Sequence, residues 1–223
     1  MRLISLVVFS LLCPVSTLAQ SVTVEHGVIF YQSADGTARR RIDPSGMVRD
    51  ARLSPDGRTI AYVNATPDRL IMATGEESQA TELGTIGVDG RNARVLVRGR
   101  QSESPQEVLA DFISPRFSPD GQRIYFLSAA WAVSGAVHAV EVATGREWFI
   151  MPGNSLEVVA RGEYAGHLLV SQHRYFMVAG SYDWLWLFTP DGKEVGPLGD
   201  GETAVEEFRE MYETSGPEPA TAP

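Results

Sequence analysis

The chain has 223 residues, of which 43% are hydrophobic and 21% are charged, and its formal net charge is −9 at pH 7. This length and composition are sufficient for one substantial hydrophobic core. The acidic charge excludes binding to nucleic acid or to anionic lipid by bulk electrostatics, so we expect no nucleic-acid partner.

Residues 1–19 have the pattern of a secretory signal peptide. Arg2 precedes an apolar run at 3–12, and Pro14 and a small-residue segment, STLA, follow it. The pattern predicts cleavage after Ala19. One alternative is an N-terminal membrane anchor, although the apolar run has about ten residues and a spanning helix needs roughly 20. The other alternative is a lipoprotein signal at Cys13.

Cleavage after residue 19 would leave a mature chain without cysteine and with a net charge of −10, from 18 basic and 28 acidic residues. The stability of such a chain would depend on burial rather than on disulfides. No further apolar run reaches the length of a bilayer. We therefore expect a periplasmic or secreted protein with no integral membrane segment after cleavage.

The segments ARLSPDGRTIAYV (51–63) and PRFSPDGQRIYFL (115–127) share one pattern, 64 residues apart. Each has Ser-Pro-Asp-Gly between strand-like runs. Proline presets the second position of a tight turn, aspartate tolerates the third, and glycine accepts the left-handed conformation that closes it. The pattern predicts two β-hairpins. Their structural turn residues are Pro55, Asp56, Gly57, Pro119, Asp120 and Gly121.

Further Asp-Gly and Thr-Gly turns alternate with these hairpins, at Gly36, Gly90, Gly145 and Gly192. The repeating unit is strand A, turn, strand B, loop, strand C, turn, strand D. It occurs at roughly 47–98, 110–151 and 156–197, after a C–D half unit at 22–44 to which SVTVE (21–25) adds a strand. A period of about 40 to 55 residues with four strands per unit is typical of β-propeller blades.

The Ser-Pro-Asp-Gly hairpin, with Arg-Leu or Arg-Phe before it and Ile-Ala-Tyr or Ile-Tyr-Phe after it, resembles the WD-like repeat of TolB-type propellers. The same repeat occurs in the non-catalytic propellers of prolyl-oligopeptidase-type peptidases. The resemblance implies an all-β propeller of about four four-stranded blades over residues 20–200, in a bacterial envelope protein. The blades would form either a closed ring or an open arc, whose unpaired edges would permit a homo-oligomer.

The sequence period changes after residue 200. In ETAVEEFREMYET (202–214) the apolar residues recur three and four positions apart, which predicts an amphipathic helix over 201–215. The helix would either cover apolar propeller surface or dock a partner. Residues 216–223 have the composition of a disordered tail.

Sequence patterns for catalysis and for metal binding are absent. The chain has no Gly-x-Ser-x-Gly nucleophile elbow, no phosphate-binding loop and no EF-hand spacing. We therefore expect no enzyme activity, no metal and no cofactor. The histidines lack metal-ligand spacing, and they are His26, His138, His167 and His173. The aspartates that could suggest a glycosidase all belong to turns, and they are Asp56, Asp120 and Asp191.

The segment SYDWLWLF (181–188) is apolar on both faces of a predicted strand. This is expected of a strand that lies between two neighbouring blades. A sugar-stacking platform is the alternative.

The irregular segments of the repeat are predicted to gather at one end of the propeller. They are the B–C loop at 65–80, the D–A connection at 98–110, and the segments 129–135 and 173–181. Long loops on a rigid scaffold commonly carry function. Arginine and large aromatic residues dominate interface hot spots. The candidate binding residues are Arg69, Arg100, Trp131, Arg174 and Tyr175.

Two classes of function are compatible with these patterns. The first is an exported, non-catalytic propeller scaffold that binds a protein or a component of the cell envelope. The second is a small-ligand or carbohydrate sensor, or an enzyme, that uses the mouth of the propeller channel. The absence of a catalytic pattern favours the first.

Overall fold

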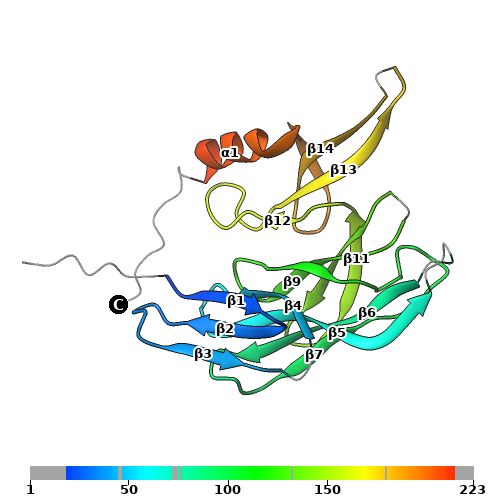
Figure 1. Ribbon diagram of the computed structural model, residues 1–223. Helices are drawn as coiled ribbons and strands as arrows, with labels where there is room; N and C mark the ends of the chain where they lie inside the picture. The colour runs from blue at the N-terminus through cyan, green and yellow to red at the C-terminus, as the bar shows by residue number, and fades with distance from the viewer. Residues whose placement is uncertain are drawn as a thin grey trace, which may run out of the picture.

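The computed structural model describes residues 19–44, 47–71, 75, 77–131, 133–178 and 180–213. Within these ranges the chain forms fifteen β-strands and one helix, in four antiparallel sheets that follow one another along the sequence (Figure 1). The predicted signal peptide, apart from Ala19, and the predicted tail at 216–223 lie outside the described residues.

Each sheet has the order of a propeller blade, because strands that are consecutive in sequence are neighbours in space. The first blade contains β1 (Ser21–Glu25), β2 (Val28–Gln32) and β3 (Arg39–Ile42). The second contains β4 (Met47–Leu53), β5 (Thr59–Ile71), β6 (Glu77–Gly87) and β7 (Arg94–Arg98). The third contains β8 (Ile113–Phe117), β9 (Arg123–Ser128), β10 (Ala136–Glu141) and β11 (Glu147–Pro152). The fourth contains β12 (Glu157–Val158), β13 (Leu168–Phe176), β14 (Gly180–Phe188) and β15 (Glu194–Gly199).

These strands confirm the predicted all-β fold and its repeat. Strands A to D of the three full units are β4–β7, β8–β11 and β12–β15, and SVTVE forms β1 beside the C–D hairpin of the first blade. The first blade has three strands and each of the others has four.

Both Ser-Pro-Asp-Gly segments form the predicted tight turns. Gly57 and Gly121 each have a φ of +69°, in the region that favours glycine. In each turn the serine hydroxyl donates to the aspartate at 2.5 Å, and the same carboxylate accepts the backbone N–H two residues further on. The hydrogen bond from the serine lowers the pKa of Asp56 and of Asp120. The turn aspartates are therefore held in the ionised form.

The hydrophobic core lies between consecutive blades. Each pair of adjacent blades contributes one cluster of buried side chains, and the helix adds a fourth cluster at the last blade. Representative fully buried residues from the three blade–blade clusters are Ile29, Ile60, Leu83, Phe126, Val137 and Leu168. Strands of the inner blades are therefore apolar on both faces. The segment 181–188, predicted to lie between two blades, belongs to β14 of the terminal blade, where 185–188 are buried between the third blade and the helix and 181–183 are exposed on the hairpin.

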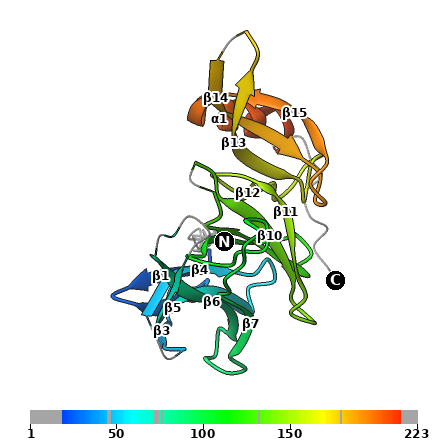
Figure 2. The same ribbon diagram turned by 90° about the vertical axis from the view of Figure 1, so that its right-hand side faces the viewer.

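The blades form an open arc. The inner strands β1, β4, β8 and β12 lie side by side in this order. No strand pairing joins the first blade to the fourth in the part of the chain that the structure describes. Figures 1 and 2 show the fourth blade standing apart from the first. Of the two arrangements that the sequence allows, the structure has the open one.

Helix α1 (Gly201–Tyr212) covers the outer face of the fourth blade. Phe208 is 3% exposed and packs with Leu169, Leu185 and Leu187 of that blade. The predicted amphipathic helix thus packs on the propeller. It occupies the face against which a further blade would pack in a larger ring.

The outer face of the first blade is polar. The Arg39 guanidinium lies 4.3 Å from the centre of the Phe30 ring and 2.6 Å from the carboxylate of Glu25. Polar outer faces are a requirement of the terminal units in repeat proteins. Among the described residues, then, one end of the arc is covered by a helix and the other by charged side chains.

Two segments that are predicted to be irregular form hairpins, although the register of the first shifts between Ala65 and Arg69. Strands β5 and β6 pair as far as Ile71 and Glu77, and β13 and β14 pair as far as Phe176 and Gly180. Two extended segments that pair with each other provide hydrogen-bond partners for each other's backbone N–H and C=O groups. Their pairing can therefore continue beyond the edge of the blade. The described parts of 98–110 and 129–135 are mainly loops, as predicted. No described helix is long and apolar enough to cross a bilayer.

Candidate functional site

The B–C hairpins and the D–A connections meet at one end of the arc, as the antiparallel order of the blades requires. We call this surface the binding face, and it consists of the described residues of 65–81, 99–112, 129–135, 153–154 and 171–181. Backbone hydrogen bonds of 2.8 to 3.0 Å link its segments in series. They join Gly99 to Thr81, Ala129 to Ala110, Gly153 to Gly135 and Asn154 to Ser171.

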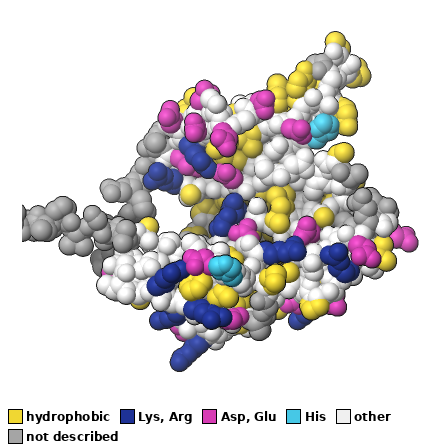
Figure 3. Space-filling model, viewed as in Figure 1, with side chains coloured by type: hydrophobic (Ala, Val, Ile, Leu, Met, Phe, Trp, Pro, Cys, Tyr) yellow, Lys and Arg dark blue, Asp and Glu magenta, His cyan; other side chains and the backbone are white. Residues whose placement is uncertain are grey.

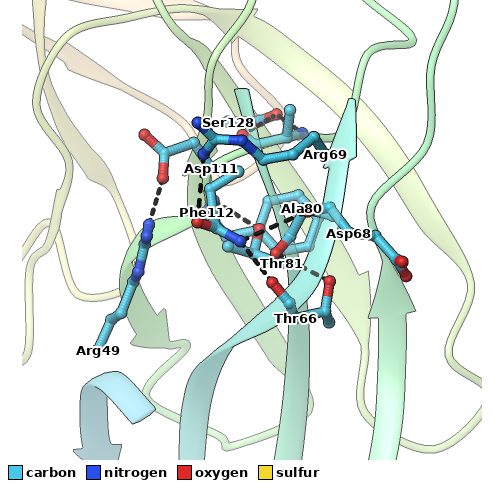
Figure 4. A network of polar contacts seen from close by, with 11 residues as sticks. Arg49, Thr66, Asp68, Arg69, Ala80, Thr81, Asp111, Phe112 and Ser128 are labelled. Atoms are coloured by element: carbon cyan, nitrogen blue, oxygen red, sulfur yellow. Dashed lines mark hydrogen bonds and ion pairs between the residues drawn. The ribbon is translucent and has the colours of Figure 1, made fainter. Parts of the chain in front are cut away.

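A polar network holds the D–A connection between the second and third blades (Figure 4). Asp111 accepts a hydrogen bond from Arg49 at 2.6 Å. The backbone N–H of Phe112 donates to Thr81 Oγ1 at 2.9 Å, and that of Ala110 donates to the hydroxyl of Ser128 at 2.9 Å. Side chains from β4, β6 and β9 therefore fix this one connection.

Two residues of this segment have left-handed backbone conformations. Asp111 has a φ of 48° and Ser114 has a φ of 53°. Such conformations cost an L-residue about 1–3 kcal/mol, although aspartate tolerates them comparatively well. The N–H of Ser114 donates to Asp50 Oδ2 at 3.1 Å, and this hydrogen bond stabilises the left-handed conformation of Ser114. Backbone strain of this kind often marks functional loops.

Arg100 and Trp131, two of the predicted binding residues, are connected through the third blade. The Arg100 guanidinium lies 3.4 Å from one oxygen of Glu147, and the other oxygen lies 2.6 Å from His138 Nδ1. His138 is fully buried and packs edge-to-face against Phe149, whose ring centre is 6.2 Å from that of Trp131. The structure thus brings these two residues into one chain of contacts.

A shallow pocket of about 500 Å³ lies beside Arg100. It lies between β7 and the start of β11, and its lining includes Val97, Arg98, Leu109 and Glu147. The pocket is open to solvent and mixes apolar with charged side chains. It offers a recess in which a side chain of a bound molecule can lie next to the guanidinium.

Arg69 makes an ion pair within its own hairpin, and Arg174 makes one with the neighbouring strand β15. Arg69 lies 3.6 Å from Glu77 on the paired strand. The Arg174 guanidinium lies 3.6 Å from the centre of the Trp186 ring and 2.8 Å from Glu194. Arg174 therefore has intramolecular partners, whereas the Arg69–Glu77 pair stands exposed on a projecting hairpin.

Tyr175 belongs to an apolar tip at the end of the β13–β14 hairpin, seen at the upper right of Figure 3. Its side chain is 78% exposed, and those of Met177 and Val178 are 99% exposed or more. Of this tip the sequence patterns predict only Arg174 and Tyr175, and not the apolar residues that follow them. The available signal was the run Tyr-Phe-Met-Val at a hairpin turn, where polar residues are expected.

A second group that the sequence patterns do not predict consists of charged residues on the inner strands. Arg52 on β4 and Arg116 on β8 occupy the same position of the repeat, two residues before Ser-Pro-Asp-Gly. Arg52 pairs with Asp50 at 2.9 Å, whereas Arg116 has no ion pair within the described ranges. Burial and the neighbouring Arg52 lower the pKa of Arg116, and the carboxylates of Asp50 and Glu157 partly oppose this shift. The group therefore includes one guanidinium whose charge is not neutralised by an ion pair.

The histidines occupy structural positions. His26 is a turn residue between β1 and β2, His138 is in the core, and His173 lies 2.9 Å from Asp183 on the paired strand. No group of three metal-ligating side chains is present among the residues described. Asp191, the third turn aspartate, forms an ion pair of 3.1 Å with Arg123.

No protein-family model matches the sequence, and no curated protein matches it. The fold is similar to solved β-propellers. TolB from Acinetobacter baumannii aligns with a TM-score of 0.51 and 13% identity, over 81% of this chain and 40% of that one. A putative TolB from Agrobacterium tumefaciens aligns with a TM-score of 0.53 and 13% identity, over 82% and 58%.

A chain of the nidogen/laminin complex aligns with a TM-score of 0.51 and 14% identity, over 79% of this chain and 57% of that one. The chain therefore spans between 40% and 58% of the length of these three proteins. At such identities the similarity establishes the fold. It confirms the resemblance to TolB-type propellers at that level.

Proposed function

We propose that the protein is a non-catalytic propeller scaffold of the bacterial envelope that binds a protein partner through its binding face. The observation that carries the proposal is the continuous set of hydrogen-bonded connections that forms this face. A loop surface that is fixed before binding loses little conformational entropy when a partner docks. A rigid face of this kind suits recognition of a second folded protein.

The residue types on the face support the same function. Trp131 and Arg100 lie at the two ends of one contact chain, with a recess beside the arginine. Tryptophan and arginine are the residues most enriched in interface hot spots. Arg69 and its partner Glu77 are both exposed, so they belong to the polar rim that such interfaces have.

The similar structures are compatible with this proposal. One of them is from the nidogen/laminin complex, in which a protein with this fold was solved together with another protein. The two TolB structures are from bacteria, and the signal-peptide pattern of the first 19 residues would direct the chain out of the cytoplasm. We therefore place the partner in the envelope.

A second candidate is a sensor for a small anionic ligand. The observation that favours it is Arg116, whose partly buried guanidinium on an inner strand lacks an ion pair in the described part of the chain. A carboxylate or phosphate group would neutralise it. Loss of ligand binding in Arg116→Gln, with capture of the protein partner unchanged, would support this function instead.

The test of the first function is a pull-down from envelope extract with the mature protein as bait. We expect the double variant Trp131→Ala, Arg100→Ala to lose the captured partner. The control is Arg58→Ala, which removes an exposed arginine from the turn at the opposite end of the arc. Far-UV circular dichroism and the melting temperature should stay close to those of the wild type. Capture that survives the double variant would contradict the proposed face.

A further inference from the structure

We propose that the tip of the β13–β14 hairpin inserts into the interface of a lipid bilayer. The tip consists of Tyr175, Phe176, Met177, Val178 and Tyr182. This inference goes beyond the proposed function, because it concerns a lipid surface and not the protein partner.

The hairpin projects from the body of the protein in both ribbon views (Figures 1 and 2). Its two strands pair from Leu168 and Phe188 to Phe176 and Gly180, so its end extends well beyond the short inner strand β12. The Met177 and Val178 side chains are as exposed as in an extended peptide, at 104% and 99%. No described part of the fold covers them.

The side chains of the hairpin are arranged in layers along its length. Met177 and Val178 form the end, Phe176 and Tyr175 come next, and Tyr182 lies one step further back, opposite Arg174. The Arg174 guanidinium reaches back to Glu194 and to the ring of Trp186, and His173 lies behind, next to Asp183. Strands rise by about 3.3 Å per residue, which places Arg174 roughly 10 Å behind Met177.

This layering matches the chemistry of a bilayer interface. Interfacial segments bury their apolar groups about 5–10 Å deep, which is the depth of the uncharged tip. Tyrosine and tryptophan concentrate at the level of the headgroups, where their rings lie in a mixed environment. The charged residues behind them would remain in water. Each layer of the hairpin thus has a counterpart in the depth profile of the membrane.

The apolar side chains also point to lipid rather than to a groove on a protein. Successive residues of a strand point to opposite faces, so Tyr175 and Phe176 project from different sides of the ribbon. A groove that receives a strand or hairpin usually contacts one apolar face, whereas lipid surrounds an inserted tip on all sides. Phe176 and Tyr182 lie on one side of this tip, and Tyr175, opposite Ser181, lies on the other, so large apolar groups occur on both sides, which favours lipid.

The tip is preformed. The rings of Phe176, Tyr182 and Trp184 have centre-to-centre distances of 5.6 to 6.0 Å. Aromatic pairs at such distances stabilise the arrangement of a hairpin. Insertion would therefore require little reorganisation of the tip.

Charge determines which lipids would be bound. No Lys, Arg, Asp or Glu occurs from 175 to 182, and the chain as a whole is acidic. Attraction to anionic headgroups therefore cannot drive binding. We infer that apolar insertion drives it, so that binding to zwitterionic lipid should persist at high salt.

The experiment uses co-sedimentation of the mature protein with phosphatidylcholine vesicles at low and high NaCl. We expect the wild type to sediment with the vesicles at both salt concentrations. Met177→Glu and Val178→Glu should each weaken partitioning by about tenfold or more, because an apolar group is lost and a charge is introduced. Met47→Glu is the control, since it places the same charge at another methionine that is 65% exposed.

Absence of wild-type binding to vesicles would overturn the proposal, and so would equal partitioning by Met177→Glu and Met47→Glu. If Met177→Glu loses a protein partner in lipid-free extract while the wild type ignores vesicles, the tip is a protein contact and the proposal is wrong. Circular dichroism should be unchanged in all three variants, because each replaced side chain is exposed. The vesicle assay contains no partner protein, so its outcome is independent of the proposed function.

Discussion

Arg49 on β4 and Asp111 in the connection before β8 form an ion pair of 2.6 Å, although 62 residues separate them in the chain. The pair joins the second and third blades at the binding face. Both side chains are more than a third exposed, and exposed ion pairs contribute about 0–1 kcal/mol to the free energy of unfolding. The left-handed backbone of Asp111 should therefore matter more to stability than its charge.

Two substitutions at residue 111 separate these effects. Asp111→Asn removes the charge but keeps a side chain that tolerates a φ of 48°, so we expect a loss of less than about 1 kcal/mol. Asp111→Val also forces a β-branched residue into this conformation and should cost about 1–3 kcal/mol more. Urea unfolding of both variants measures the difference. Equal losses would show that the backbone conformation of residue 111 is unimportant.

Gly121→Val tests the Ser-Pro-Asp-Gly turn. A side chain at this position is disfavoured by the φ of +69° and not by lack of space. The nearest atom to a Cβ placed there is 4.0 Å away. We expect a loss of about 1–3 kcal/mol, which for a chain of this size lowers the melting temperature by several degrees. Gly196→Ala is the matched control, with no atom within 4 Å and no left-handed φ. Similar melting temperatures for the two variants would argue against a tight turn at Gly121.

Phe208→Ala tests the attachment of helix α1 to the fourth blade. Truncation of a buried phenylalanine typically costs about 3–5 kcal/mol, and a helix at the end of the arc should fall near the lower value. The variant should also bind more of a dye that reports exposed apolar surface, because Leu169 and Leu187 become accessible. Met211→Ala, at a side chain that is 60% exposed on the same helix, should change neither measurement appreciably. A stable Phe208→Ala would mean that the helix is not needed as a cover.

The turn aspartates predict a loss of stability in acid. Hydrogen bonds from Ser33, and next from Thr37, lower the pKa of Asp35 to about 2, and Ser54 and Ser118 lower the pKa values of Asp56 and Asp120. A folded pKa below the unfolded value of about 3.9 stabilises the fold above that pH, and the contribution disappears as the pH falls from about 4 towards 2. Urea midpoints at pH 6, 4 and 3 should fall in that order. The urea midpoint of Asp35→Asn should fall less with decreasing pH than that of the wild type. An identical pH dependence of the two proteins would contradict the lowered pKa of Asp35.

The predicted export has a direct test in the mass of the purified protein. Expression of the full chain in a bacterial host should give a periplasmic or secreted product that begins at Gln20. Retention of residues 1–19 in a cytoplasmic product would refute the signal peptide. A product that begins at Cys13 and carries a lipid would instead support the lipoprotein alternative.

The sequence predicted those features that depend on residues close together in the chain. The turns at Gly57 and Gly121 and the order of the strands follow from local chemistry and its period. The contact chain from Arg100 through Glu147 to His138 could not be predicted, because a repeat pattern does not specify which side chains of adjacent blades meet. The sequence predicts irregular segments at 65–80 and 173–181, where the structure has long paired strands. Pairing beyond the blade depends on the partner strand and not on local turn signals. The openness of the arc likewise depends on long-range packing.

Helix α1 and the polar face of the first blade cover the two ends of the arc separately, so the two ends are independent of each other. In a closed propeller, strand pairing joins the first blade to the last. Local opening of either blade therefore disturbs the whole ring. Here the blades are coupled as nearest neighbours, as in a linear array, so the first blade and helix α1 can each open while the two central blades remain folded. The fourth blade, which carries the projecting hairpin, keeps its hydrogen-bonded and packed contact with the third blade when the first blade opens. Opening at the far end of the arc should therefore leave the hairpin and the segments that bind the partner in a fixed arrangement.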